Sequence, residues 1–272
     1  MYFLTASLVT ELIFLGACTG FMAGLLGIGG GMLMVPLITI ILTVRGVPAD
    51  IAVKAAIATS MATIIFTSIA SVRAHHKRRA VHWGIVKSLA PGILIGGVIA
   101  SMGVFALLKG QWLAIFFAVF VGFSATQMFL DRKPAPSRQM PGSAGQLAAG
   151  GLIGFLSGLV GAGGGFISVP FMTWCNVAIH NAVATSAALG LPIALVNVFG
   201  YVLSGTKVAG LPHGSAGYIW LPALVVIAIA SVLTAPLGAK AAHALPVKRL
   251  KRIFASFLYV LAAYMLWRGL NS

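Results

Sequence analysis

The sequence has few charged residues and very few acidic ones. Of its 272 residues 8% are charged, and Asp and Glu together contribute three. An average soluble domain carries about 25% charged residues. This deficit, with a hydrophobic content of 60%, excludes an ordinary soluble domain and indicates a polytopic membrane protein. The two cysteines, Cys18 and Cys175, are too few and too isolated for a disulfide framework or a thiolate metal site.

Motifs of several common activities are also missing from the sequence. It has no Gly-x-x-x-x-Gly-Lys-Ser/Thr nucleotide loop, which argues against ATP-driven transport. It has no His-Glu-x-x-His or Gly-x-Ser-x-Gly motif, which argues against an intramembrane enzyme. The histidines of residues 75–82 have no carboxylate or cysteine beside them, so they predict no metal site. We therefore expect no catalytic activity, no cofactor and no bound metal.

The formal net charge of +15 needs a separate explanation. In a soluble protein it would suggest a nucleic-acid partner. Here the basic residues flank apolar runs and carry no recognition motif, so we expect no nucleic-acid binding. Cytoplasmic loops of membrane proteins collect Lys and Arg, and we interpret the charge as topological information.

Apolar runs of membrane-helix character occur along the whole chain. They fall at about 6–27, 30–44, 51–72, 83–107, 112–130, 146–160, 165–178, 182–204, 217–238 and 250–268. Most reach the roughly 20 residues that a bilayer core requires. The run 30–44 would cover only about 22 Å at 1.5 Å per residue, against a core of roughly 30 Å. We predict that such short runs are the returning arms of broken or re-entrant hairpins.

Two of these regions contain closely similar stretches, residues 20–37 and 154–171. At a constant offset of 134, ten of eighteen positions are identical, including the glycine triplets 29–31 and 163–165 and one proline each. Glycine weakens a helix and proline removes a backbone donor, so each copy predicts a helix break. In hydrocarbon a break is tolerated only where protein or a water-filled cavity takes up the freed backbone groups. Matched breaks in two halves point to the binding site of a transporter.

The repeat extends over the rest of the chain. Ala58-Thr59-Ser60 is matched by Ala184-Thr185-Ser186, and Leu113–Leu130 aligns with Leu250–Trp267. Each repeat is predicted to hold one glycine-broken or re-entrant hairpin and three spanning helices. The expected division is a first repeat at 1–131, a basic cytoplasmic linker at 132–145 and a second repeat at 146–272.

The basic residues favour five membrane elements in each half over four. With five, the segments 73–82, 132–138 and 239–252 share one face, which then holds twelve of the eighteen Lys and Arg residues. With four, the third segment falls on the other face, against the positive-inside rule. An odd number makes the halves inverted copies, an arrangement that suits alternating access. We therefore predict an all-α polytopic membrane protein of two inverted repeats, with both termini outside.

The recognisable pattern is Gly-x-Gly-Gly-Gly followed by Pro, paired with a downstream Ala-Thr-Ser and present in both halves. It resembles the TauE/SafE family of sulfite exporters, also called the toluene sulfonate uptake permease group, over essentially the whole chain. The resemblance implies a multi-pass protein of the bacterial inner membrane that moves a small anion, mostly a sulfur-containing one such as sulfite, a sulfonate or a related organic acid. We expect a secondary active transporter, with export as the expected direction. The alternatives are a passive anion channel and a carrier of a non-sulfur organic acid.

A physical reading of the breaks agrees with an anionic substrate. A helix that restarts at a break points free N–H groups and a positive dipole end at it, and such an end binds oxyanions without a charged side chain. Serine and threonine hydroxyls are further donors, although small residues also serve close helix packing. Asn197 follows Gly190–Pro192, which predicts one more break in the second half only. The candidate substrate-binding residues are Gly29, Gly30, Gly31, Thr59, Ser60, Gly163, Gly164, Gly165, Thr185, Ser186 and Asn197.

Three ionisable residues lie within or beside the apolar runs, and each has two alternative roles. Glu11 is the one acid within an apolar run, which makes it a candidate proton relay, while interfacial exposure is the simpler explanation. Lys54 and His180 occupy equivalent positions near helix ends. There a side chain usually extends toward the interface, and attraction of anions is the alternative. The expected partners are a small anionic substrate, the lipid bilayer, and a coupling proton or sodium ion, with the oligomeric state left open.

Overall fold

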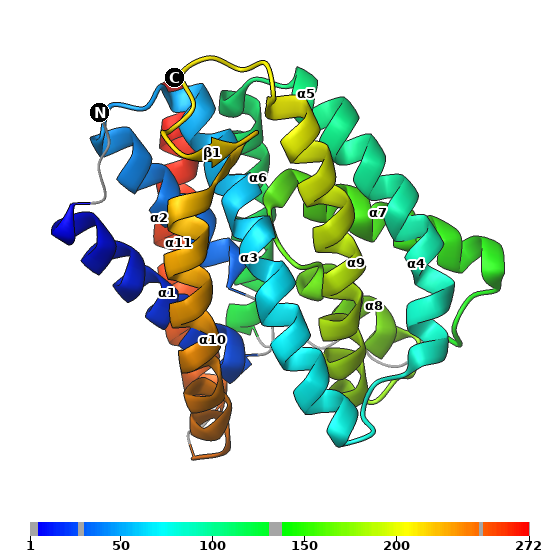
Figure 1. The fold of residues 1–272 in the computed structure, drawn as a ribbon. Helices are drawn as coiled ribbons and strands as arrows, with labels where there is room; N and C mark the ends of the chain where they lie inside the picture. Colours follow the sequence, from blue (N-terminus) through cyan, green and yellow to red (C-terminus); the bar gives the residue numbers. More distant parts are fainter. Residues whose placement is uncertain (1–4, 27–29, 131–137, 245–246, 272) are drawn as a thin grey trace.

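The computed structural model describes residues 5–26, 30–130, 138–244 and 247–271, and this part of the chain is almost entirely helical (Figure 1). Its helical elements are α1 (Ala6–Leu26), α2 (Gly31–Val44), α3 (Ala49–Lys77), α4 (Trp83–Val98), η1 (Ile99–Val104, a π-helical segment), α5 (Phe105–Leu107), α6 (Gly110–Leu130), α7 (Ser143–Val160), α8 (Gly165–Trp174), α9 (Ile179–Gly205), α10 (Leu221–Ala244) and α11 (Val247–Leu270). Two short antiparallel strands, β1 (Ser215–Ala216) and β2 (Ile219–Trp220), form a hairpin before α10.

Eight helical segments in the described residues are long and apolar enough to cross a bilayer. One of them combines α4, η1 and α5 as Trp83–Leu107. Helix α2 has 14 residues and α8 has 10, which correspond to about 21 Å and 15 Å at 1.5 Å per residue. The predicted all-α polytopic fold is confirmed, and short helices follow both glycine stretches as expected.

Several of the long helices, among them α3, α9 and α10, run lengthwise between the upper and lower ends of the view (Figure 1). Helix α3 ends and α4 begins at the lower end of the view, where α10 also ends and α11 begins. The β1–β2 hairpin and the end of α11 lie at the upper end. We call the end with residues 73–82 the basic end and the end with residues 215–220 the hairpin end. The count of five membrane elements in each half and the inversion of the halves across the membrane stay predictions.

Helices of one half pack on helices of the other. Helix α1 packs on α10 and α7 packs on α4, while α3 packs on α9 and α6 packs on α11. Each of these pairs joins a helix of the first half to a helix of the second. The two predicted repeats are therefore interleaved rather than packed as separate bodies.

Glycines allow the tightest of these pairs to approach backbone to backbone. A Cβ atom at Gly96 of α4 would overlap the main chain of Gly151 in α7. A Cβ atom at Gly20 of α1 would overlap the main chain of Ser231 in α10. Because lipid tails are as apolar as leucine, membrane helices associate through such close packing rather than through the hydrophobic effect.

This close contact predicts a stability difference between two Gly→Ala variants. Gly96→Ala should lower the thermal unfolding midpoint in detergent, because overpacking a tight contact costs about 1–3 kcal/mol. The matched control is Gly122→Ala in α6, where a Cβ would meet no atom within 4 Å. Alanine favours a helix over glycine by about 1 kcal/mol, so the control should unfold at the same or a higher temperature. Equal midpoints for the two variants would contradict the packing.

The predicted extra break at Gly190–Pro192 is wrong. Helix α9 runs without interruption from Ile179 to Gly205, with Pro192 inside it. Proline is tolerated within membrane helices where neighbouring groups satisfy the freed backbone. Gly190 serves close packing instead, since a Cβ there would lie 2.6 Å from Ser68 Oγ of α3.

Candidate functional site

The second glycine stretch breaks the chain between two helices, as predicted. Helix α7 ends at Val160 and α8 begins at Gly165. Gly161 and Gly164 have φ angles of 70° and 77°, a left-handed conformation that glycine adopts without steric cost. The Gly161 amide donates to the Ser157 carbonyl at 2.9 Å and closes the end of α7.

The first glycine stretch lies directly against the second. Helix α1 ends at Leu26 and α2 begins at Gly31, with Gly30 as its N-cap. Residues 27–29 between them, including the candidate residue Gly29, lie outside the described residues. A Cβ at Gly31 would be 2.5 Å from the Gly161 carbonyl oxygen and 3.0 Å from Ala162 Cα. The two glycine stretches, one from each half, therefore meet inside the protein.

Main-chain donors are available at this meeting point. The first N–H groups of a helix have no acceptor within it, which applies to Gly165 and Phe166 of α8. Among the described residues, no main-chain acceptor receives the amides of Gly163 and Gly164. The positive end of the α8 dipole lies at the same place. The second break therefore presents several main-chain N–H donors, and helix α8 contains no acidic side chain that would repel an anion.

The two predicted serines form hydrogen bonds within the protein. Ser60 of α3 donates to the Gly161 carbonyl at 3.0 Å and lies 3.4 Å from the Gly31 carbonyl, so it contacts both breaks. Ser186 of α9 accepts a hydrogen bond from Ser168 of α8 at 2.7 Å. Ser60 thus joins the two breaks, and its hydroxyl proton is used in this contact.

The two predicted threonines contact the starts of other helices. Thr59 accepts a hydrogen bond from the Trp220 amide just before α10, at 3.0 Å. Thr185 accepts one from the His82 amide just before α4, also at 3.0 Å. Accepting leaves each hydroxyl proton available for donation. The equivalent threonines of the two halves therefore make equivalent contacts, each to the opposite half.

Two buried polar atoms near the second break have no hydrogen-bond partner in the part of the chain that the structure describes. Asn197 of α9 donates through Nδ2 to the Ile193 carbonyl at 2.8 Å, while its Oδ1 is unpaired among the described residues. The Ser157 hydroxyl of α7 is likewise unpaired and lies 3.1 Å from the position of a Cβ added to Gly164. Unsatisfied buried polar groups are uncommon and destabilising. The sequence analysis did not include Ser157 among the candidate residues. Its equivalent in the first repeat is Ala23, and this difference between the two copies could have identified Ser157.

The candidate residues thus fall into three groups. At the meeting of the two breaks lie Gly30, Gly31, Ser60, Gly163, Gly164 and Gly165. Asn197 and Ser186 border the second break from α9. Thr59 and Thr185 lie beside the starts of α10 and α4 rather than at the breaks.

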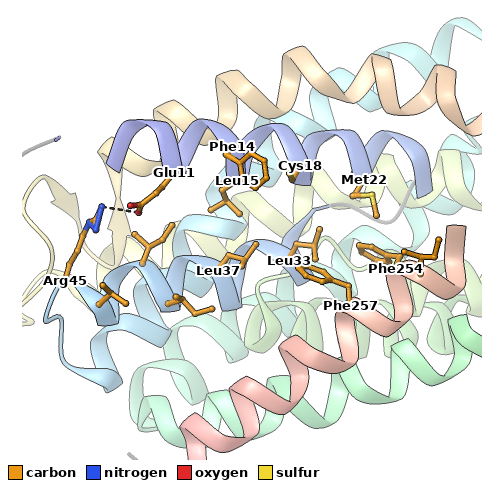
Figure 2. Close-up of a pocket in the computed structure, with 14 residues that line it drawn as sticks. Glu11, Phe14, Leu15, Cys18, Met22, Leu33, Leu37, Arg45, Phe254 and Phe257 are labelled. Carbon is orange, nitrogen blue, oxygen red and sulfur yellow. Dashed lines mark hydrogen bonds and ion pairs between the residues drawn. The ribbon is translucent and has the colours of Figure 1, made fainter. Parts of the chain in front are cut away.

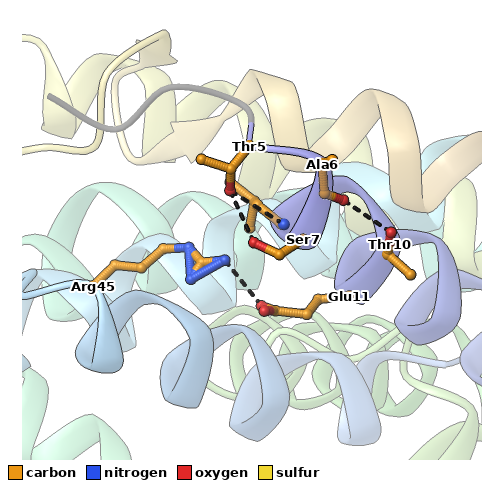
Figure 3. A network of polar contacts seen from close by, with 7 residues as sticks. Thr5, Ala6, Ser7, Thr10, Glu11 and Arg45 are labelled. Atoms are coloured by element: carbon orange, nitrogen blue, oxygen red, sulfur yellow. Dashed lines mark hydrogen bonds and ion pairs between the residues drawn. The ribbon is translucent and has the colours of Figure 1, made fainter.

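A separate groove of about 760 Å³ lies between α1, α2 and α11 (Figure 2). Its walls are mainly apolar, and Phe14 and Ile253 on them are 71% and 68% exposed, so the groove faces lipid. At one end Glu11 pairs with Arg45 at 3.1 Å (Figure 3). The Glu11 side chain is 46% exposed, which agrees with interfacial exposure better than with a buried proton relay.

Lys54 departs from the expected position at an interface. Its equivalent His180 is exposed, but Lys54 itself is only 5% exposed. The reason is the hairpin, because the Tyr218 ring carried by residues 215–220 lies over the Lys54 ammonium. In the described residues no three His, Cys, Asp or Glu side chains gather into a metal-binding group.

Comparisons with known proteins agree with this architecture. The family model described as Sulfite exporter TauE/SafE matches residues 12–265. A probable membrane transporter protein of Haemophilus influenzae is 37% identical over 254 residues, which cover 93% of this chain and 96% of the relative. A protein of the same description from Methanocaldococcus jannaschii is 28% identical over 268 residues (95% and 96%), and YunE of Bacillus subtilis, also a probable membrane transporter, is 25% identical over 286 residues (96% and 98%). No solved structure gives a significant match. The chain therefore belongs to the sulfite exporter TauE/SafE family and is a multi-pass transporter of the bacterial inner membrane.

Proposed function

We propose that the protein is a secondary carrier of a small sulfur-containing oxyanion, such as sulfite or a sulfonate, and that it works in the export direction. The observation that carries the proposal is the contact of Gly31 with Gly161 and Ala162, beside the amides of Gly163 and Gly164, which have no main-chain acceptor among the described residues. Unsatisfied backbone groups in hydrocarbon cost several kcal/mol each. A break kept at this depth is therefore best explained by a ligand that binds there.

In this proposal the anion binds to the amides of residues 163–165 at the positive end of α8. The Ser157 hydroxyl beside Gly164 supplies a further donor. Charge-assisted hydrogen bonds from amides are shorter and stronger than neutral ones, so the site needs no basic side chain. Such donors favour oxyanions as a class, and the shape of the surrounding walls selects among them.

The threonine contacts between the two halves suggest how the site reaches each side in turn. The hydrogen bonds of Thr59 to Trp220 and of Thr185 to His82 occupy equivalent positions in the two halves. We propose that the two bonds break alternately, which frees the start of α10 or of α4 and opens one end at a time. Alternating access opens a fixed central site to one side of the membrane at a time, and a proton or sodium gradient would drive it.

Transport in liposomes tests this function directly. The purified chain should move sulfite, thiosulfate or methanesulfonate with a rate that saturates, and it should show counterflow, because a carrier binds its substrate in every cycle. Lactate belongs in the same panel as the non-sulfur alternative. Linear flux without counterflow would indicate a channel, and empty liposomes are the control. If none of these anions is transported, the proposed function is contradicted.

A further inference from the structure

Lys54 is a buried positive charge without a strong partner. It lies in α3, and its side chain is only 7% exposed. The nearest acidic group in the described part of the chain is the Asp50 carboxylate at 4.0 Å, beyond hydrogen-bonding distance. No hydrogen bond of the Lys54 ammonium occurs among the residues that the structure describes. An ionisable residue buried in a spanning helix is expensive to keep and is by default a functional candidate.

The surroundings of Lys54 are aromatic rather than acidic. Its Nζ lies 5.9 Å from the ring centre of Phe105 and 5.6 Å from that of Tyr218, and ring faces attract a cation at such distances. Burial, and then the nearby Asp50 carboxylate, raises the pKa of the Tyr218 phenol above its ordinary value. The phenol therefore stays neutral at physiological pH and gives Lys54 no second negative partner.

Asp50 is held away from Lys54 by another contact. Its Oδ1 atom accepts a hydrogen bond from the Gly110 amide at the start of α6. Its side chain is 50% exposed, against 7% for Lys54. The carboxylate thus accepts a hydrogen bond from the N-terminus of α6 and is half exposed to solvent. It accepts no hydrogen bond from the Lys54 ammonium.

Lys54 lies between the hairpin end and the glycine breaks. It precedes Ser60 by six residues of α3, which is about 9 Å along the helix, and Ser60 contacts both breaks. Phe105, whose ring lies beside the Lys54 ammonium, also packs on Tyr201 with ring centres 4.4 Å apart. Tyr201 donates a hydrogen bond to the Gly158 carbonyl of α7, close to Asn197. Connected groups thus link the Lys54 surroundings to the second break.

We propose that Lys54 forms a second anion-binding site between the hairpin end and the glycine breaks, where a small oxyanion replaces Asp50 as the counter-ion of the ammonium. The hairpin covers this site through Tyr218, so a shift of residues 215–220 admits the anion. The inference rests on the proposed function, because it assigns the anion a position on its route to the breaks. Its equivalent in the other half, His180, is exposed, so the second site belongs to one half only.

The test measures anion binding at Lys54 in a variant whose site at the glycine breaks is blocked. In the full-length Gly163→Leu protein, titration calorimetry with sulfite, thiosulfate and methanesulfonate should show weak residual binding of at least one anion. Adding Lys54→Gln should lower that affinity roughly tenfold or more, the usual effect of losing a hydrogen bond to a charged group. Adding Asp50→Asn should raise it severalfold, because the amide keeps an acceptor for Gly110 and removes the competing charge. A purely structural ion pair would not give these opposite signs.

Two further variants serve as controls. Lys109→Gln removes a charge from an exposed lysine next to Gly110 and should leave the affinity unchanged. Lys54→Arg keeps the charge and should retain most of the binding. If wild type binds an anion but Gly163→Leu does not, or if Lys54→Gln has no effect there, this inference alone is overturned. If wild type binds none of the three anions, the proposed function fails and this inference with it.

Discussion

Replacement of Gly163 by leucine should strongly reduce anion transport while leaving the protein in the membrane at its normal level. Gly163 lies in the second break, and its backbone is not among the left-handed glycines. A Cβ there would approach only Ile64 Cγ2 and Cδ1, at 3.3 and 3.8 Å. The added side chain therefore fills the space beside the amides of the second break without imposing backbone strain. The loss of two hydrogen bonds to a charged ligand should reduce flux roughly 100-fold.

Other glycines of the breaks are less suitable for this experiment. Gly164 has a φ of 77°, and a Cβ there would lie 2.6 Å from Ile193 Cδ1, so Gly164→Leu combines strain with loss of function. The matched control is Gly122→Leu in α6, where no atom lies within 4 Å of an added Cβ. Flux of sulfite into liposomes is the measurement. Normal flux in Gly163→Leu would show that the glycines serve packing alone.

Cysteine labelling should divide the molecule cleanly between the two sides of the membrane. In a protein whose Cys18 and Cys175 are replaced by alanine, Arg78→Cys and Arg252→Cys should react with an impermeant maleimide only after permeabilisation. His213→Cys should react in intact cells. All three side chains are exposed, and the positive-inside rule places the basic end in the cytoplasm.

This labelling experiment distinguishes the two possible topologies. Five elements in each half put residues 78 and 252 on one face, whereas four put them on opposite faces. Labelling of these two positions from opposite sides would therefore refute the inverted arrangement of the halves. Labelling of both from the outside, with residue 213 inside, would keep the arrangement and reverse its orientation.

The helices and the breaks were predictable because their signals are local. Length and hydropathy identify a spanning helix, and a glycine triplet weakens a helix wherever it occurs. The short helices α2 and α8, which begin directly after the glycine stretches, follow from these properties. The prediction of an extra break at Gly190–Pro192 was wrong because α9 continues past Pro192, and tertiary contacts stabilise the helix there.

Helix partners and the surroundings of Lys54 were not predictable from local patterns. Membrane helices are apolar on every side, so periodicity does not tell which face of α1 packs on α10. Gly96 was visible in the sequence, but its contact with Gly151 depends on the pairing of α4 with α7. Lys54 was expected at an interface, and its burial depends on Tyr218, which lies far away in the sequence. Such contacts are set by the tertiary fold.

Direct location of a bound anion is the most decisive measurement. Selenite is a close analogue of sulfite whose selenium atom is identified by anomalous scattering in a crystal. We predict a selenium peak within hydrogen-bonding distance of the amides of residues 163–165, next to Gly31. A well-occupied selenite elsewhere, with these amides bonded to protein groups instead, would contradict the claim that the paired glycine breaks bind the transported anion.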